Sequence, residues 1–165
     1  MMKHVSFVAI LALLMSAPAA AQQTVFLVRH AERADMEKGA PPSDDPDLSN
    51  TGRARAESLA TLLKDADITA IFITKYKRTR QTAAPLATAT GLSPIVVEAT
   101  TAAAIAKEIR AQKGNVLVVG HSNTVPDIIK ALDVGTAVKI GDQDFDNLFV
   151  VTSGPTPTLL RLHYR

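Results

Sequence analysis

The 165-residue chain contains no cysteine. It therefore has no thiol nucleophile, cannot form a disulfide bond and offers no cysteine to carry a lipid anchor. It also lacks an excess of charge of one sign, with 18 lysine and arginine residues against 16 aspartate and glutamate residues. A protein that binds nucleic acid normally carries a large excess of basic residues. The near balance of charges therefore argues against a nucleic-acid partner.

No hydrophobic run in the sequence is long enough to span a bilayer. The most apolar stretch, residues 5–15, follows Lys3 and His4 and falls short of the roughly 20 residues that a spanning helix needs. It is followed by Ala19, Ala20 and Ala21, which form the A-x-A pattern that signal peptidase cleaves. We therefore expect residues 1–21 to be an export signal and residues 22–165 to form one periplasmic or secreted domain without a membrane span.

Strand-like and helix-like segments alternate along the rest of the chain. Short apolar runs typical of buried parallel strands occur at residues 25–28, 70–73, 94–97 and 115–120. Apolar residues three and four positions apart predict helices at residues 51–66, 78–90, 101–112 and 124–132. Two strand-like segments around Gly154-Pro155 predict a hairpin at a sheet edge. This alternation predicts an α/β fold, a three-layer α/β/α sandwich with a mostly parallel central sheet.

Ionisable side chains come directly after the predicted strands. Arg29 and His30 follow the first strand, and Arg78 comes shortly after the second. Glu98 follows the third strand, and His121 follows the fourth. Ligands of parallel α/β sheets bind at the carboxyl ends of the strands, so we expect these side chains to line one crevice. Arginine matches phosphate oxygens, and without cysteine the nucleophile is expected to be histidine, so the sequence predicts phosphoryl transfer.

Three segments resemble the motifs of the histidine phosphatase superfamily, which has the phosphoglycerate mutase-like fold. LVRHAER at residues 27–33 resembles the Arg-His signature, and TKYKRTRQTA at residues 74–83 resembles the second motif. LVVGHSNTV at residues 117–125 is similar to the motif of the second histidine, and LSNTGRARAESLA at residues 48–60 is also similar to the family pattern. The resemblance covers nearly all of the predicted mature chain. The short spacing between the second and third motifs resembles a compact branch 1 phosphatase rather than a mutase.

The resemblance also implies a role for each matched residue. His30 would attack phosphorus and become the phosphohistidine, while Arg29, Arg78 and His121 would hold the phosphate oxygens. Glu98 would be the acid that protonates the leaving oxygen. No metal ion or other cofactor is implied.

The identity of the general acid stays open among three carboxylates. Glu98 is the carboxylate directly after the third predicted strand, and Glu32 and Asp146 are the alternatives. Glu32 is also expected to serve as an ion-pair partner that orients an arginine. Arg80 is expected on the solvated side of its helix, and His163 is expected to be exposed on an edge strand.

Three functions are compatible with this set of residues. They are an exported phosphomonoesterase, a phosphomutase of the same fold, and a non-catalytic protein that binds a phosphorylated ligand. A pair of histidines favours the two enzymes, because a binding protein needs cations but no nucleophile. The resemblance extends to exported relatives similar to a lipopolysaccharide core heptose phosphatase, so a cell-envelope sugar phosphate is the expected small substrate. Neither the exact substrate nor the oligomeric state follows from the sequence.

Overall fold

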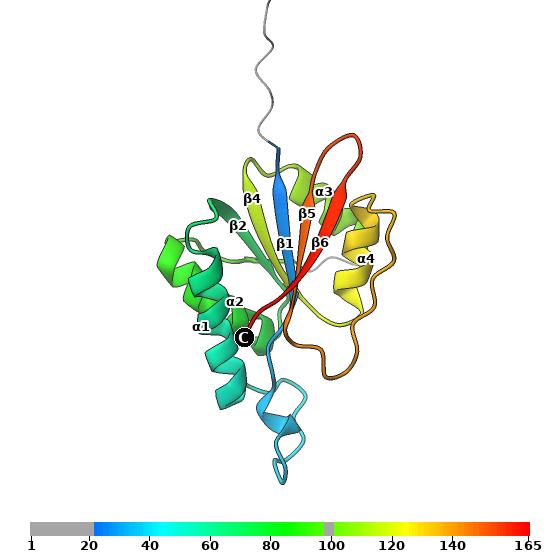
Figure 1. Ribbon diagram of the computed structural model, residues 1–165. Helices are drawn as coiled ribbons and strands as arrows, with labels where there is room; N and C mark the ends of the chain where they lie inside the picture. The colour runs from blue at the N-terminus through cyan, green and yellow to red at the C-terminus, as the bar shows by residue number, and fades with distance from the viewer. Residues whose placement is uncertain (1–21, 98–100) are drawn as a thin grey trace, which may run out of the picture.

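A computed structural model describes residues 22–97 and 101–165 of the chain. In this part of the chain one sheet holds six strands in the order β3-β2-β4-β1-β5-β6 (Figure 1). The strands are β1 (Thr24–Arg29), β2 (Ile68–Ile73), β3 (Ile95–Val96), β4 (Asn115–Gly120), β5 (Asn147–Thr152) and β6 (Thr158–His163). β1, β2, β3 and β4 pair in parallel, whereas β5 is antiparallel to both β1 and β6. The predicted α/β fold with a mostly parallel sheet is therefore confirmed.

Helices cover both faces of the sheet. Figure 1 shows α1 (Asn50–Leu63) and α2 (Lys77–Thr90) on one side, and α3 (Ala102–Arg110) and α4 (Thr124–Ala131) on the other. Neighbouring residues of β1 face opposite layers: Leu27 belongs to the same buried cluster as Ile128 of α4, and Val28 to the same cluster as Leu59 of α1. This two-sided burial explains why consecutive residues in the middle of the central strands are apolar. Within the two described ranges, no helix is both long and apolar enough to cross a membrane.

Side-chain caps mark the start of α1 and α3, and a glycine follows the last residue of α2. The Ser49 hydroxyl accepts a hydrogen bond from the Gly52 N–H at 3.0 Å and so caps the start of α1. Thr101 caps α3 in the same way, accepting from the Ala104 N–H at 3.2 Å. α2 ends at Gly91, whose φ of +70° lies in the left-handed region that glycine adopts without strain. The predicted helices are present, although α1 ends three residues before the predicted limit of residue 66.

The third predicted strand differs from the expectation. The sequence predicts a buried strand over residues 94–97, but β3 consists of Ile95–Val96 alone and lies at the edge of the sheet. The side chains of Ile95 and Val96 are 40% and 39% exposed. An apolar run of four residues has the same pattern at an edge and in the middle of a sheet, so the sequence could not distinguish the two. The predicted hairpin near the C-terminus is confirmed as β5 and β6.

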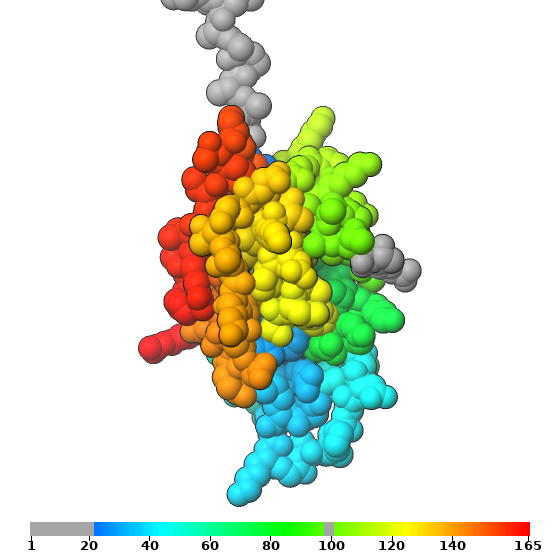
Figure 2. All heavy atoms as spheres, turned by 90° about the vertical axis from the view of Figure 1, so that its right-hand side faces the viewer, coloured from blue at the N-terminus to red at the C-terminus, as the bar shows by residue number. Residues whose placement is uncertain are grey.

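The segment between β1 and α1 lies beyond the carboxyl end of β1. It contains a short 3-10 helix, η1 (Ala34–Met36), and residues 36–39 and 41–44 in its middle are exposed. Figure 2 shows it as a projection at one end of the molecule, next to the connection from α4 to β5. α1 packs closely against the start of this segment at Gly52. A side chain at this position would collide with the carbonyl oxygen of Glu32. The glycine of the LSNTGR segment thus lets α1 approach the Arg-His turn.

Candidate active site

His30 lies directly after β1 and is almost fully buried, with 4% of its surface exposed. Its backbone N–H donates to the Gly120 carbonyl at 2.9 Å, which extends the pairing of β1 with β4. Its Nδ1 atom lies 2.8 Å from the carbonyl oxygen of Ala31. A carbonyl oxygen can only accept, so this geometry assigns the proton to Nδ1. Nε2 therefore carries the free lone pair that a nucleophile needs.

The environment of His30 keeps the imidazole neutral. Burial lowers the pKa of His30 from 6.5 to about 3, because the charged ring would lose its hydration. The positive charges of Arg29 and Arg78 and the neighbouring His121 lower this pKa further, while the hydrogen bond to Ala31 acts in the opposite direction. At neutral pH the lone pair on Nε2 is thus available.

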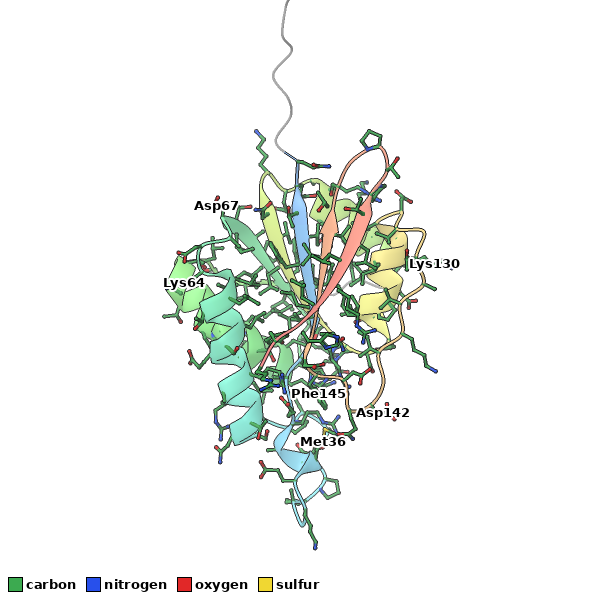
Figure 3. All side chains as sticks on the ribbon, in the orientation of Figure 1. Met36, Lys64, Asp67, Lys130, Asp142 and Phe145 are labelled. Carbon is green, nitrogen blue, oxygen red and sulfur yellow. The ribbon has the colours of Figure 1, made fainter. Side chains whose placement is uncertain are left out.

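Arg29 is the last residue of β1 and is 9% exposed. Its Nη1 donates to the carbonyl oxygens of Gly141 and Asp142, both at 2.9 Å. Its guanidinium carbon lies 4.0 Å from the centroid of the Phe145 ring. Its Nε atom is buried and has no hydrogen-bond partner within the described part of the chain. Figure 3 places Phe145 and Asp142 at the end of the sheet where β1 finishes.

Arg78 reaches the same end of the sheet from the first turn of α2. Its guanidinium carbon lies 4.1 Å from the centroid of the Tyr76 ring, and its Nη1 lies 3.9 Å from an oxygen of Asp45. Like that of Arg29, its Nε is buried without a partner among the described residues. A buried charged donor without an acceptor is costly, so the two Nε–H groups suit an anionic ligand with several oxygens.

His121 lies directly after β4, next to His30. The centroids of the two imidazole rings are 5.3 Å apart. The His121 Nε2 lies 3.1 Å from the Thr74 hydroxyl, and its backbone N–H donates to the Thr124 hydroxyl at 2.9 Å. Burial lowers the pKa of His121 from 6.5 to about 4, with the charges of Arg78 and Arg29 as further causes. Both histidines are therefore neutral at pH 7.

Thr82 connects the end of β1 to α2. Its hydroxyl accepts from the Ala31 N–H at 2.9 Å and donates to the Arg78 carbonyl at 2.7 Å, and its side chain is fully buried. This contact holds the Arg-His turn against the helix that carries Arg78. It gives a physical reason for the spacing of Arg78 and Thr82 in the second motif, because residues four apart lie on the same face of a helix.

The three candidate acids have different positions. Glu32 forms a bidentate ion pair with Arg55, whose Nε lies 3.0 Å from both carboxylate oxygens, so it orients an arginine as expected. Asp146 lies 3.0 Å from Nδ1 of His163, at a part of the surface where both side chains are exposed. Glu98 lies outside the described residues. The exposed position of Arg80 on α2 agrees with the expectation for that residue.

Two aromatic residues of the site were missed by the sequence interpretation. Tyr76 lies within the second motif, and its place two residues before Arg78 was the only signal for it. Phe145 comes from the long connection between α4 and β5, where no periodic pattern marks a contact with the site. Among the described residues, no group of three or more histidine, aspartate and glutamate side chains is arranged to hold a metal ion.

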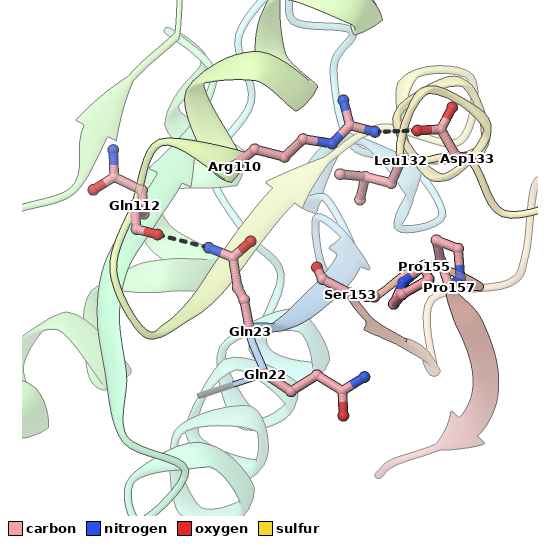
Figure 4. Close-up of a pocket in the computed structure, with 10 residues that line it drawn as sticks. Gln22, Gln23, Arg110, Gln112, Leu132, Asp133, Ser153, Pro155 and Pro157 are labelled. Carbon is pink, nitrogen blue, oxygen red and sulfur yellow. Dashed lines mark hydrogen bonds and ion pairs between the residues drawn. The ribbon is translucent and has the colours of Figure 1, made fainter. Parts of the chain in front are cut away.

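A hollow lies at the opposite end of the sheet from His30 (Figure 4). It has a volume of about 640 Å³ and is lined by residues near the start of β1, the end of α3 and the turn between β5 and β6. Gln23 anchors this region by donating to the carbonyls of Ile109 and Gln112 at 2.9 and 3.1 Å. The hollow contains none of the residues that surround His30, so the candidate active site is at the other end.

Comparisons with known protein families and solved structures give matches in sequence and in fold. Residues 25–101 match the family model of the histidine phosphatase superfamily (branch 1), which includes the first two motifs. The fold is similar to that of the protein histidine phosphatase SixA complexed with tungstate (TM-score 0.67, 18% identity, 85% of this chain and 96% of that chain). It is also similar to a candidate phosphohistidine phosphatase SixA from Agrobacterium tumefaciens (TM-score 0.63, 22% identity, 84% and 97%).

A third similar structure is a candidate alpha-ribazole-5'-P phosphatase from Escherichia coli (TM-score 0.69, 16% identity, 86% of this chain and 96% of that chain). At these identities the three likenesses establish the fold. The comparison with curated proteins gave no match.

Proposed function

Because the chain belongs to the histidine phosphatase superfamily (branch 1), we propose that it is a phosphomonoesterase that works through a phosphohistidine on His30. One observation carries the proposal. A buried neutral histidine with a free Nε2 lies beside two arginines, each of which has a buried Nε–H without a partner in the described part of the chain. A phosphate group matches this arrangement, because it offers an electrophilic phosphorus to the histidine and several oxygens to the arginines.

In the first step, the lone pair on His30 Nε2 attacks phosphorus and the bond to the ester oxygen breaks. Negative charge develops on the phosphoryl oxygens and on the leaving oxygen. Arg29 and Arg78 stabilise the phosphoryl oxygens through charge-assisted hydrogen bonds, and His121 holds a further oxygen. Under the proposal Glu98 gives its proton to the leaving oxygen, since Glu32 and Asp146 are paired with Arg55 and His163.

In the second step, water attacks the phosphohistidine and inorganic phosphate leaves. The carboxylate formed on Glu98 in the first step takes the proton from the attacking water, so the site returns to its starting state. His30 Nε2 regains its lone pair when the P–N bond breaks. The hydrogen bond from Nδ1 to Ala31 persists through both steps and keeps the ring in place.

The short chain between α2 and β4 favours hydrolysis over mutase chemistry. Between the end of α2 at Thr90 and the start of β4 at Asn115, the described elements are β3 and α3. A mutase must protect its phosphoenzyme from water, whereas a phosphatase needs water to reach it. The SixA structure is described as a complex with tungstate, a tetrahedral oxyanion, which supports oxyanion binding by a site of this fold.

The proposal includes export of the enzyme and a small phosphorylated substrate. Residues 1–21 lie outside the described residues, and their role as a signal peptide rests on the sequence pattern. A cell-envelope sugar phosphate is the proposed substrate class for an enzyme in that compartment.

One experiment separates the proposed function from its alternatives. The protein comprising residues 22–165 is incubated with phosphomonoesters labelled in the phosphate group, and the label is followed. Transfer to water supports the phosphatase, and transfer to a second position on the product identifies a mutase. Binding without transfer identifies a phospho-ligand binding protein. The same reactions with the His30→Ala variant serve as the control for activity from a contaminating enzyme.

A further inference from the structure

Two aromatic rings contact the site in the same way. The Tyr76 ring lies 4.1 Å from the guanidinium carbon of Arg78 and 5.5 Å, centroid to centroid, from the ring of His121. The Phe145 ring lies 4.0 Å from the guanidinium carbon of Arg29 and 6.1 Å from the ring of His30. Each ring therefore contacts one arginine and one histidine of the site.

The topology explains this arrangement. Tyr76 lies between β2 and α2, and Phe145 lies immediately before β5. β2 and β5 are the strands on either side of β4 and β1, which carry the two histidines. The rings therefore enclose the histidines from both flanks. The His121 ring meets the Tyr76 ring at an interplanar angle of 86°, an edge-to-face contact that is favourable for aromatic groups.

The two arginines depend on their rings to different degrees. Arg29 is also held by two carbonyl acceptors at 2.9 Å. For Arg78, the other described polar contact of the guanidinium is an Asp45 oxygen at 3.9 Å, which is too long for a hydrogen bond, and the Asp45 side chain is 38% exposed. An arginine side chain has many rotamers, and a stacking surface restricts them at a small cost. Tyr76 is thus the main constraint on the direction of Arg78.

We propose that Tyr76 is a positioning residue that holds Arg78 and His121 in the geometry required to bind a tetrahedral oxyanion. It acts through its aromatic ring and not through its hydroxyl group. This inference rests on one part of the proposed function, namely that the site binds a phosphate-like anion. It predicts that a phenylalanine at this position suffices and that an aliphatic residue does not.

The test measures tungstate binding by calorimetry in the wild type and in Tyr76→Phe, Tyr76→Leu and Lys77→Ala variants. Lys77→Ala is the matched control, because Lys77 is the next residue in the chain and its cationic side chain is exposed. We expect Tyr76→Leu to weaken tungstate binding about tenfold, as loss of a partly desolvated cation–π contact would. Tyr76→Phe and Lys77→Ala should bind as the wild type does.

A double-mutant cycle tests whether Tyr76 acts through Arg78. Replacing the guanidinium by the ammonium of Arg78→Lys removes the fork that stacks on the ring. In that background, Tyr76→Leu should cost much less than in the wild type. Equal costs in both backgrounds would contradict the inference. If Tyr76→Leu lowers the melting temperature strongly, the comparison of Tyr76→Phe with Tyr76→Met replaces it, since methionine fills a similar volume without a ring.

The outcomes distinguish this inference from the proposed function. Failure of the wild type to bind tungstate, with the fold intact, would contradict the proposed anion site. Binding by the wild type that Tyr76→Leu leaves unchanged would contradict the positioning role alone. A Tyr76→Phe variant as weak as Tyr76→Leu would assign the effect to the hydroxyl and overturn the inference in the form given.

Discussion

The Nδ1 atom of His30 lies 2.8 Å from the carbonyl oxygen of Ala31, the next residue in the chain. This contact determines which nitrogen of the ring is protonated, and it leaves the opposite nitrogen, Nε2, with the lone pair of a nucleophile. The backbone turn after β1 thus fixes the tautomer of His30 that can act as the nucleophile. Ala31 is fully buried at this turn.

Removal of either arginine should impair binding and turnover. We expect Arg29→Ala or Arg78→Ala to lower kcat/KM by about 10²-fold to 10³-fold, the usual cost of losing one preorganised donor to a developing charge. Arg80→Ala is the matched control, because Arg80 is exposed on the same helix as Arg78. Steady-state kinetics with p-nitrophenyl phosphate measures the effect. An Arg80→Ala loss as large as that of Arg78→Ala would mean that this interpretation of the site is wrong.

The depressed pKa values of the two histidines predict how stability depends on pH. In the folded protein the pKa of His30 is lowered from 6.5 to about 3 and that of His121 to about 4. Between these values and 6.5 the unfolded chain binds more protons than the folded one, so stability falls as the pH falls through this window. The slope approaches about 1.4 kcal/mol per pH unit for each histidine.

Denaturant unfolding of the wild type and of His30→Asn at pH 7 and pH 4.5 measures this dependence. The variant keeps a polar side chain but cannot be protonated in this range. We expect the loss of stability between the two pH values to be smaller in the variant than in the wild type. An equal loss would show that His30 is readily protonated in the folded protein.

The sequence was sufficient for the fold and for the strand-end residues, but not for the contacts between them. His30 and His121 follow buried parallel strands. The carboxyl ends of such strands lie at the same edge of the sheet, so the two histidines are brought together whatever the side-chain contacts are. The position of β3 at the edge of the sheet, and therefore its exposure, depends on the order of the strands. A four-residue apolar pattern carries no information about that order. Phe145 reaches the site through a connection without periodicity, so only the three-dimensional path of residues 133–146 places it beneath Arg29.

The role of Glu98 as general acid can be tested by varying the leaving group. A general acid contributes about 10² to 10⁴ in rate, but only when the leaving group is poor. Glu98→Gln should therefore slow hydrolysis of an alkyl phosphate by about that factor and slow p-nitrophenyl phosphate hydrolysis far less, because nitrophenolate leaves without a proton. Equal losses on both substrates would assign Glu98 to positioning. Little loss on either would redirect the search to Asp146 and Glu32.

If the protein is exported, cleavage of its signal peptide should lower the mass of the mature protein. If residues 1–21 are a signal peptide, the protein isolated from its native host should begin at Gln22. Intact-mass spectrometry of the periplasmic and cytoplasmic fractions measures this directly. Accumulation of the full chain with Met1 in the cytoplasmic fraction, and none of the shorter form elsewhere, would contradict export.

The central claim is that His30 carries the phosphoryl group during turnover, and trapping that intermediate tests it most directly. Wild type and His30→Ala are mixed with a substrate labelled in the phosphate and quenched within milliseconds, and the label on the chain is measured after acid or alkali treatment. EDTA is included in half of the reactions and should change nothing. We predict a label on the wild type that is labile in acid and stable in alkali, as expected for a phosphoramidate, and no label on His30→Ala. A label that persists on His30→Ala, or one that survives acid, would contradict the account.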